Sequence, residues 1–259
     1  MNIQRNNIHS FYGIFNKILE NYMAARIVTV FNQKGGCGKT MTCMQLAAAF
    51  ALRGHRTLLV DMDKQGTSTI WAGQAGADKP FPATVISLAP LREKMLGEIE
   101  KHAANYDFIF IDCPPAIESS IPWAALNVSD IGLIPVIPLM DNVWASREAK
   151  ELARRAKQEN ASLQTYCIPS MSRRGNVFKA CTEILQDDQE IPLLDTGLQQ
   201  RNAYGESQMF GLSVHAVAGA GAAVKEVEAL ADVVLEKLGL PVGKKSGKTK
   251  ATKQNVEVV

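Results

Sequence analysis

A glycine-rich loop with two lysines constrains the fold of this chain more than any other feature of its sequence. Residues 34–40 read KGGCGKT, and they lie between an apolar run at 27–31 and a helical stretch at 40–52. Glycines let the backbone curl so that successive N–H groups point at phosphate oxygens, and the helix N-terminus adds partial positive charge. A strand, this loop and a helix in that order predict a phosphate-binding loop.

The side chains of the loop indicate a nucleoside triphosphate with Mg²⁺ as the ligand. Lys39 should reach the β- and γ-phosphates, and the Thr40 hydroxyl should bind Mg²⁺. The usual pattern has a glycine five residues before Gly38, but this chain has Gln33 there, followed by a further lysine. The predicted nucleotide-binding residues are Lys34, Gly35, Gly36, Cys37, Gly38, Lys39, Thr40 and Met41.

The rest of the chain alternates short apolar runs with helical stretches. Strands are expected at 27–31, 57–60, 84–88, 108–111, 131–137 and 163–168, and helices at 40–52, 91–104, 118–127, 144–159, 176–186 and 222–238. Continuously apolar strands that alternate with helices predict an α/β fold, a mostly parallel doubly wound sheet with helices on both faces. We expect one such domain over residues 25–240.

Aspartates follow two of the apolar runs. Asp112 follows 108–111, and Asp61 and Asp63 follow 57–60. The carboxyl ends of parallel strands converge on one crevice, so these acids are expected to face the same Mg²⁺–nucleotide. Asp112 should hold the ion through water. Taken alone, either site could equally be a helix cap or a solvated turn.

The ends of the chain and its bulk composition carry less information. Residues 1–24 form an N-terminal extension that could be a short amphipathic helix, and the lysine-rich residues 241–259 are expected to be disordered. A net charge of +2 means that any nucleic-acid contact must use a local basic patch. No apolar run reaches the roughly 20 residues that span a bilayer, and no secretory signal is recognisable, so a cytoplasmic protein is expected.

These motifs together resemble the ParA/MinD group of deviant Walker ATPases, and most closely the short ParA partition branch that lacks an N-terminal helix-turn-helix domain. The resemblance covers about residues 26–240. It rests on the loop at 34–40, on DMDKQG at 61–66, on IDCPP at 111–115 and on SDIGLIPV at 129–136. One departure is Lys64, which stands where the family usually has proline.

The resemblance implies a catalytic set and a homodimer. Lys34 would reach across the interface to the ATP phosphates of a second subunit, Lys39 would serve its own subunit, and Asp63 would position the attacking water. Asp61 would lie near Mg²⁺, with Thr40 and Asp112. ATP held between two subunits would then join them, and hydrolysis would release them.

The resemblance also implies partners. Relatives of this type bind DNA without sequence preference and work with a ParB-like adaptor that stimulates slow hydrolysis, which would place the protein on the nucleoid. The candidate DNA-binding residues are Arg173, Arg174, Lys179 and Arg201. Phosphate contacts need only positive charge on one face, which would form when two subunits join. The cargo could be a plasmid, a chromosome region or a protein assembly.

Two alternatives share this nucleotide site. A MinD-like membrane switch would need a lipid-binding amphipathic helix, and the chain after Gly239 has too few large apolar residues to supply one. Membrane attachment is therefore not expected. The other alternative is metabolic, because amide ligases and iron-protein reductases share the site. A reductase would need paired cysteines at the dimer axis, and neither Cys37 nor Cys113 is well placed for that.

Overall fold

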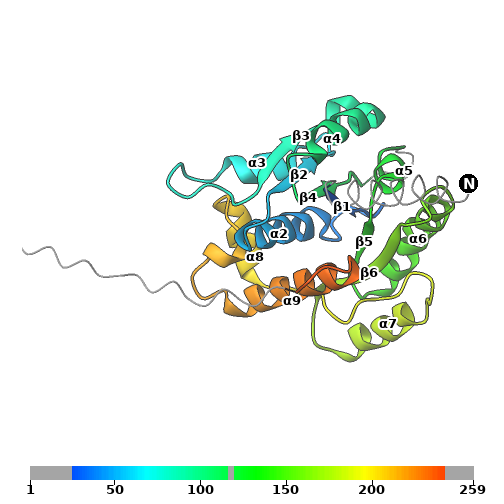
Figure 1. Cartoon of the computed structure of the whole chain (residues 1–259). Coiled ribbons are helices and arrows are strands. Elements are labelled where there is room, and N and C mark those ends of the chain that lie inside the picture. The colour runs from blue at the N-terminus through cyan, green and yellow to red at the C-terminus, as the bar shows by residue number, and fades with distance from the viewer. Residues whose placement is uncertain (1–24, 116–119, 243–259) are drawn as a thin grey trace, which may run out of the picture.

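A computed structural model of the chain describes residues 25–115 and 120–242 (Figure 1). Its strands are β1 (Arg26–Val30), β2 (Thr57–Asp61), β3 (Thr84–Ser87), β4 (Phe108–Asp112), β5 (Ile131–Val136), β6 (Gln164–Ser172) and β7 (Leu198–Gln199). Its α-helices are α2 (Lys39–Leu52), α3 (Thr67–Gly73), α4 (Met95–Ala103), α5 (Ser120–Asn127), α6 (Met140–Glu159), α7 (Asn176–Gln186), α8 (Asn202–Met209) and α9 (Gly221–Lys237). The strands form one sheet in the order β3-β2-β4-β1-β5-β6-β7, and all neighbours are parallel.

Helices cover both faces of the sheet, as Figure 1 shows. Strand β4 illustrates why: all five of its residues are buried, and they alternate between the two cores. Phe108 and Phe110 join α2 and α9 on one face, where both rings meet Phe50 edge-on with centroids 4.5 and 5.2 Å apart. Ile109 and Ile111 join α4, α5 and α6 on the other face. A strand buried on both faces needs a continuous apolar run, so the predicted α/β class is confirmed.

The parallel arrangement fixes where the predicted site lies. The carboxyl ends of β1, β2 and β4 share one edge of the sheet, and the register pairs Asp61 with Asp112 across neighbouring strands. The loop at 31–38 leaves β1 at this edge and leads into α2. We call this edge of the sheet, at the carboxyl ends of the strands, the nucleotide edge. Every helix that directly follows a strand begins there.

Some predicted elements differ from the structure. The helix expected at 91–104 is a 3₁₀ segment, Ala89–Lys94, followed by α4, and Arg92 interrupts it with a φ of 52°. Helix α6 begins four residues before the expected 144, and β6 extends four residues beyond the expected 168. Helices α3 and α8 and strand β7 were not predicted. The N-terminal extension at 1–24 and the tail from 243 lie outside the described residues.

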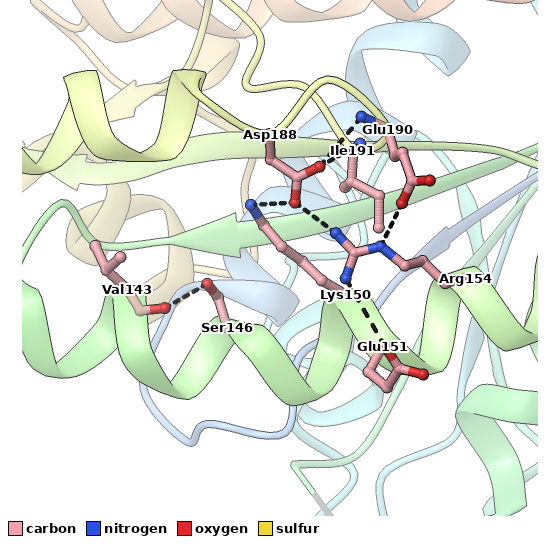
Figure 2. Close-up of polar contacts among 8 residues, drawn as sticks. All are labelled: Val143, Ser146, Lys150, Glu151, Arg154, Asp188, Glu190 and Ile191. Atoms are coloured by element: carbon pink, nitrogen blue, oxygen red, sulfur yellow. Dashed lines mark hydrogen bonds and ion pairs between the residues drawn. The ribbon is translucent and has the colours of Figure 1, made fainter.

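An ion-pair cluster holds the segment after α7 against α6 (Figure 2). Asp188 Oδ2 accepts hydrogen bonds from Lys150 Nζ at 3.0 Å and from Arg154 Nη2 at 2.8 Å. Its Oδ1 accepts the backbone N–H groups of Glu190 and Ile191, each at 3.1 Å. Lys150 is only 7% exposed, so Asp188 compensates a nearly buried charge.

We expect Asp188→Ala to lower the free energy of unfolding by about 2–3 kcal/mol, because it leaves the Lys150 ammonium buried and unpaired. Burial alone would raise the pKa of Asp188, but the Ile191 N–H, the hydrogen bond from Lys150 and the positive charges of Lys150 and Arg154 outweigh it and lower that pKa. A lowered pKa stabilises the fold above the ordinary aspartate value, about 4, and this contribution is lost as the pH falls further. Urea unfolding at pH 7 and pH 3 should therefore show a smaller difference between variant and wild type at pH 3.

Glu183→Ala is the matched control for Asp188→Ala. Its carboxylate lies 3.9 Å from Lys179, and both side chains are exposed. The loss should stay below about 0.5 kcal/mol. Equal effects of the two substitutions would show that the Asp188 cluster does not stabilise the fold.

Candidate functional site

The conformation of the loop after β1 depends on two of its glycines and on one asparagine. Gly36 and Gly38 have φ values of 73° and 92°, which L side chains rarely adopt. The Asn32 side chain anchors the start of the loop, because it donates to the carbonyl of Pro135 at 2.9 Å and accepts the Lys34 N–H at 3.1 Å. The loop is thus fixed to β5 on one side and to α2 on the other.

Lys39 is the first residue of α2, and its side chain turns back onto this loop. It is 7% exposed, and its Nζ donates to the Lys34 carbonyl oxygen at 3.0 Å. Cys37 is buried beside it, and burial raises the pKa of its thiol, which keeps it uncharged. A lysine beside a glycine-rich loop at a helix N-terminus is the arrangement that binds phosphates.

Thr40, Asp112 and Ser68 converge next to the loop. Asp112 Oδ2 accepts hydrogen bonds from the Thr40 and Ser68 hydroxyls, each at 2.8 Å. The other carboxylate oxygen, Oδ1, is buried and has no hydrogen-bond partner among the described residues. A hydroxyl and a carboxylate with an unsatisfied oxygen are oxygen ligands of the kind that Mg²⁺ takes, directly or through water. These residues therefore fit the ion that accompanies a nucleoside triphosphate.

The protonation of Asp112 reflects this environment. Burial raises its pKa to about 7, and the charge of Asp61 acts in the same direction. The hydrogen bonds from Thr40 and Ser68 oppose this shift without cancelling it. A bound divalent cation would favour the charged carboxylate, so ion binding here should release a proton near neutral pH.

The two other aspartates lie at the same edge and have partners within the chain. Asp61 is fully buried, and it accepts the backbone N–H of Asp63 at 3.1 Å and the N–H and hydroxyl of Thr69 at 3.0 Å. It therefore joins β2 to α3. Asp63 is partly exposed and accepts the Gln65 N–H at 3.0 Å. The metal role of Asp61 and the water-positioning role of Asp63 stay predictions.

Lys34 lies on the outer side of the loop and meets α6. Its Nζ is 2.5 Å from Asp141 Oδ2, and the two side chains are 31% and 63% exposed. The hydrogen bond from Lys34 is the main cause of a lowered pKa at Asp141. An ion pair this exposed is weak, so Lys34 can exchange it for a stronger anion.

The four candidate DNA-binding residues lie near the end of β6 and the start of α8. Arg173, Arg174 and Lys179 are exposed, and the Arg173 guanidinium donates to the Gln200 side chain. Arg201 differs, because its guanidinium pairs at 2.5 Å with Glu226 of α9. Lys179 also lies 3.9 Å from Glu183, but both of these side chains are exposed, whereas the Arg201 pair is partly buried.

The structure adds three polar residues that sequence reasoning did not single out. Ser68 contacts Asp112, Asn32 anchors the loop and Asp141 pairs with Lys34. Ser68 belongs to the unpredicted helix α3, and Asp141 to the part of α6 before the expected start. Only contacts between segments far apart in the chain reveal them.

A cavity of about 620 Å³ lies away from this site, between the second half of α6, the start of β6 and the segment 189–192. Its charged groups include Arg154 and Glu190, which already pair with each other at 2.6 Å. The cavity contains none of the loop residues. It is therefore separate from the nucleotide edge.

Comparisons with known proteins agree with this geometry. Residues 28–214 match the family of CobQ/CobB/MinD/ParA nucleotide binding domains. The maintenance of carboxysome distribution protein A of Halothiobacillus neapolitanus is 28% identical over 212 residues, which cover 80% of this chain and 95% of that protein. The chromosome partitioning protein ParA of Myxococcus xanthus is 34% identical over 148 residues, 43% of this chain and 52% of the relative.

A solved structure shares the fold. The structure of the McdA–ATP complex from Cyanothece aligns with a TM-score of 0.69 at 16% identity, and the match covers 84% of this chain and 98% of that one. The family match alone spans well over half of the chain and includes the loop, Asp61, Asp63 and Asp112. The chain therefore belongs to the CobQ/CobB/MinD/ParA family of nucleotide-binding domains.

Proposed function

We propose that this protein is a ParA-like ATPase. It binds ATP with Mg²⁺, forms a homodimer around the nucleotide, binds DNA without sequence preference, and positions a cargo with an adaptor protein. The cargo class is a plasmid, a chromosome region or another large assembly. In this proposal the protein is cytoplasmic and associates with the nucleoid.

One observation carries the proposal: two lysines of the same loop face different directions. Lys39 is buried beside the loop, whereas Lys34 extends outward to Asp141. Lys39 is positioned for a phosphate bound by its own subunit. A partner's phosphates would offer Lys34 a more highly charged anion than the exposed Asp141 carboxylate.

Hydrolysis in this proposal uses the groups around Asp112. Thr40 and Asp112 would hold Mg²⁺, and Asp63 would orient the attacking water. Lys34 of one subunit and Lys39 of the other would stabilise the charge that develops on the transferred phosphoryl group. The adaptor would increase the slow basal rate.

Support for the DNA step comes from exposed positive charge next to the nucleotide edge. Arg173 and Arg174 follow β6 at this edge, and Lys179 lies in the first turns of α7. Such charges attract phosphates without reading base sequence. Dimer formation would bring two copies of this cluster together and would make DNA binding depend on ATP.

We expect alanine at Arg173, Arg174 and Arg201 together to weaken ATP-dependent binding to random duplex DNA. Each lost phosphate contact should also reduce the slope of log K against log salt by about one. Gel shifts at several salt concentrations, with ATP, ADP or no nucleotide, measure both quantities. Lys101→Ala is the control, because it removes an exposed charge from α4 near the opposite edge of the sheet.

Flotation with anionic vesicles, run beside the gel shifts, tests the MinD-like alternative. None of the helices in residues 25–115 and 120–242 has the length and apolarity that a membrane crossing needs. ATP-dependent flotation without any DNA shift would replace the partition proposal with the membrane one. Unchanged DNA binding in the triple variant would instead show that the DNA site lies elsewhere on the protein.

A further inference from the structure

An exposed tryptophan lies at the nucleotide edge. The chain has three tryptophans. Trp71 is 2% exposed and Trp123 is partly buried, whereas Trp144 is 56% exposed. It belongs to the second turn of α6, the helix that begins directly after β5. Trp144 is therefore the most exposed of the three tryptophans, and packing within the described residues leaves more than half of it accessible to solvent.

Trp144 adjoins the contact that Lys34 makes with α6. Asp141, the partner of Lys34, precedes Trp144 by three residues, so both side chains lie on the same side of the helix. A second apolar side chain, Val177, is 60% exposed in the first turn of α7. Helices α6 and α7 are in contact, and both begin at the nucleotide edge. Val177 lies between the candidate DNA-binding residues Arg174 and Lys179, so we restrict the term edge patch to Trp144 and its neighbours on α6, Asp141, Arg147 and Glu148.

We propose that the edge patch is buried against a second copy of this chain, with Trp144 as its main apolar anchor. This inference rests on the proposed function, in which Lys34 acts on the phosphates of a partner subunit. If Lys34 leaves Asp141 for those phosphates, the partner must approach within a side-chain length of this end of α6. Trp144 lies one helical turn away and would be covered by the same approach.

A twofold dimer would place the same side chain of both copies in the interface. Tryptophans in the centre of interfaces contribute a large share of the binding energy, because they bury much area at little cost in side-chain entropy. The structure thus assigns an apolar contact to an association that otherwise depends on charge and nucleotide.

The charges around Trp144 favour a protein partner over DNA or an anionic membrane. Asp141 and Glu148 are exposed on the same helix, on either side of Trp144 along its surface. Arg147 offsets one of these two acids, and Lys34 offsets the other until it leaves Asp141 for the phosphates of a partner. The acid that is then unpaired repels the phosphates of nucleic acid and lipid, whereas a second copy provides the nucleotide that Lys34 would contact.

The test compares dimer formation in three forms of the full chain with Mg²⁺ and a non-hydrolysable ATP analogue. Sedimentation velocity gives the dimer dissociation constant of the wild type, Trp144→Ala and Met209→Ala. Met209 is 72% exposed at the end of α8, so its replacement is a matched removal of an exposed apolar side chain elsewhere. We expect Trp144→Ala to raise the constant about tenfold or more and Met209→Ala to leave it unchanged.

Tryptophan fluorescence provides a second measurement. Dimer formation should shift the emission of the wild type to shorter wavelength, and Trp144→Phe should lose the shift while it still dimerises. Equal dimer dissociation constants for the wild type and Trp144→Ala overturn the edge patch but leave the proposed function intact. A wild type that stays monomeric overturns both. Loss of DNA binding in Trp144→Ala with an unchanged dimer would assign the patch to DNA and overturn the proposal.

Discussion

Replacement of Lys34 by glutamine is expected to abolish ATP-dependent dimerisation and to lower ATP hydrolysis at least about 100-fold, because a transition-state cation supplied from a second subunit has effects of this size or larger. The affinity of the monomer for ATP should change little, within about threefold. In the proposed mechanism the difference arises because Lys39, which is buried beside the loop, would bind the phosphates of its own subunit, whereas Lys34 faces outward. Hydrolysis assays, light scattering and nucleotide titration of one preparation separate the three quantities.

Asp141→Asn is the control for Lys34→Gln. Both substitutions remove the ion pair between the loop and α6, but only Lys34→Gln removes the cation. Asp141→Asn should therefore still dimerise with ATP. If Asp141→Asn reproduces the defect of Lys34→Gln, the lysine acts by holding α6 within its own subunit. A strict monomer in all nucleotide states, wild type included, would contradict the sandwich dimer itself.

The central strands could be predicted from the sequence because each one is a short, continuously apolar run. The five residues of β4 are all buried, as expected of a strand that is covered by helices on both faces of the sheet. The glycine loop then sets the direction of the sheet relative to the nucleotide. For this reason the positions of Lys39, Thr40 and Asp112 could be anticipated from spacing alone.

Short elements and long-range ion pairs could not be predicted in the same way. Helix α3 has seven residues, begins after a left-handed glycine and buries only Ser68 and Trp71, which is too few for a periodic pattern. The pairing of Arg201 with Glu226 joins α8 to α9 across 25 residues of sequence. An exposed arginine and a paired one are indistinguishable in sequence, so their availability to DNA depends on the fold.

Gly38→Ala is expected to weaken ATP binding about 100-fold or more, because it deforms the loop whose N–H groups would contact the phosphates. Gly38 has a φ of 92°, a conformation that is strained for any residue with a Cβ atom. A Cβ at this position would lie 2.4 Å from the Ser170 hydroxyl, and Ser170 is fully buried, so it has little room to move aside. The loop must therefore shift away from β6 or distort its backbone.

Gly35→Ala tests whether loop geometry, and not glycine content, is responsible. A Cβ at Gly35 meets no atom within 4 Å, so the same added methyl group should change the ATP affinity by less than about threefold. Calorimetric titration with Mg²⁺–ATP measures both variants, and circular dichroism checks that each is folded. The double variant Gly38→Ala, Ser170→Gly removes the close contact but keeps the backbone strain, so it should recover only part of the affinity. Wild-type affinity in folded Gly38→Ala would mean that the phosphates bind outside this loop.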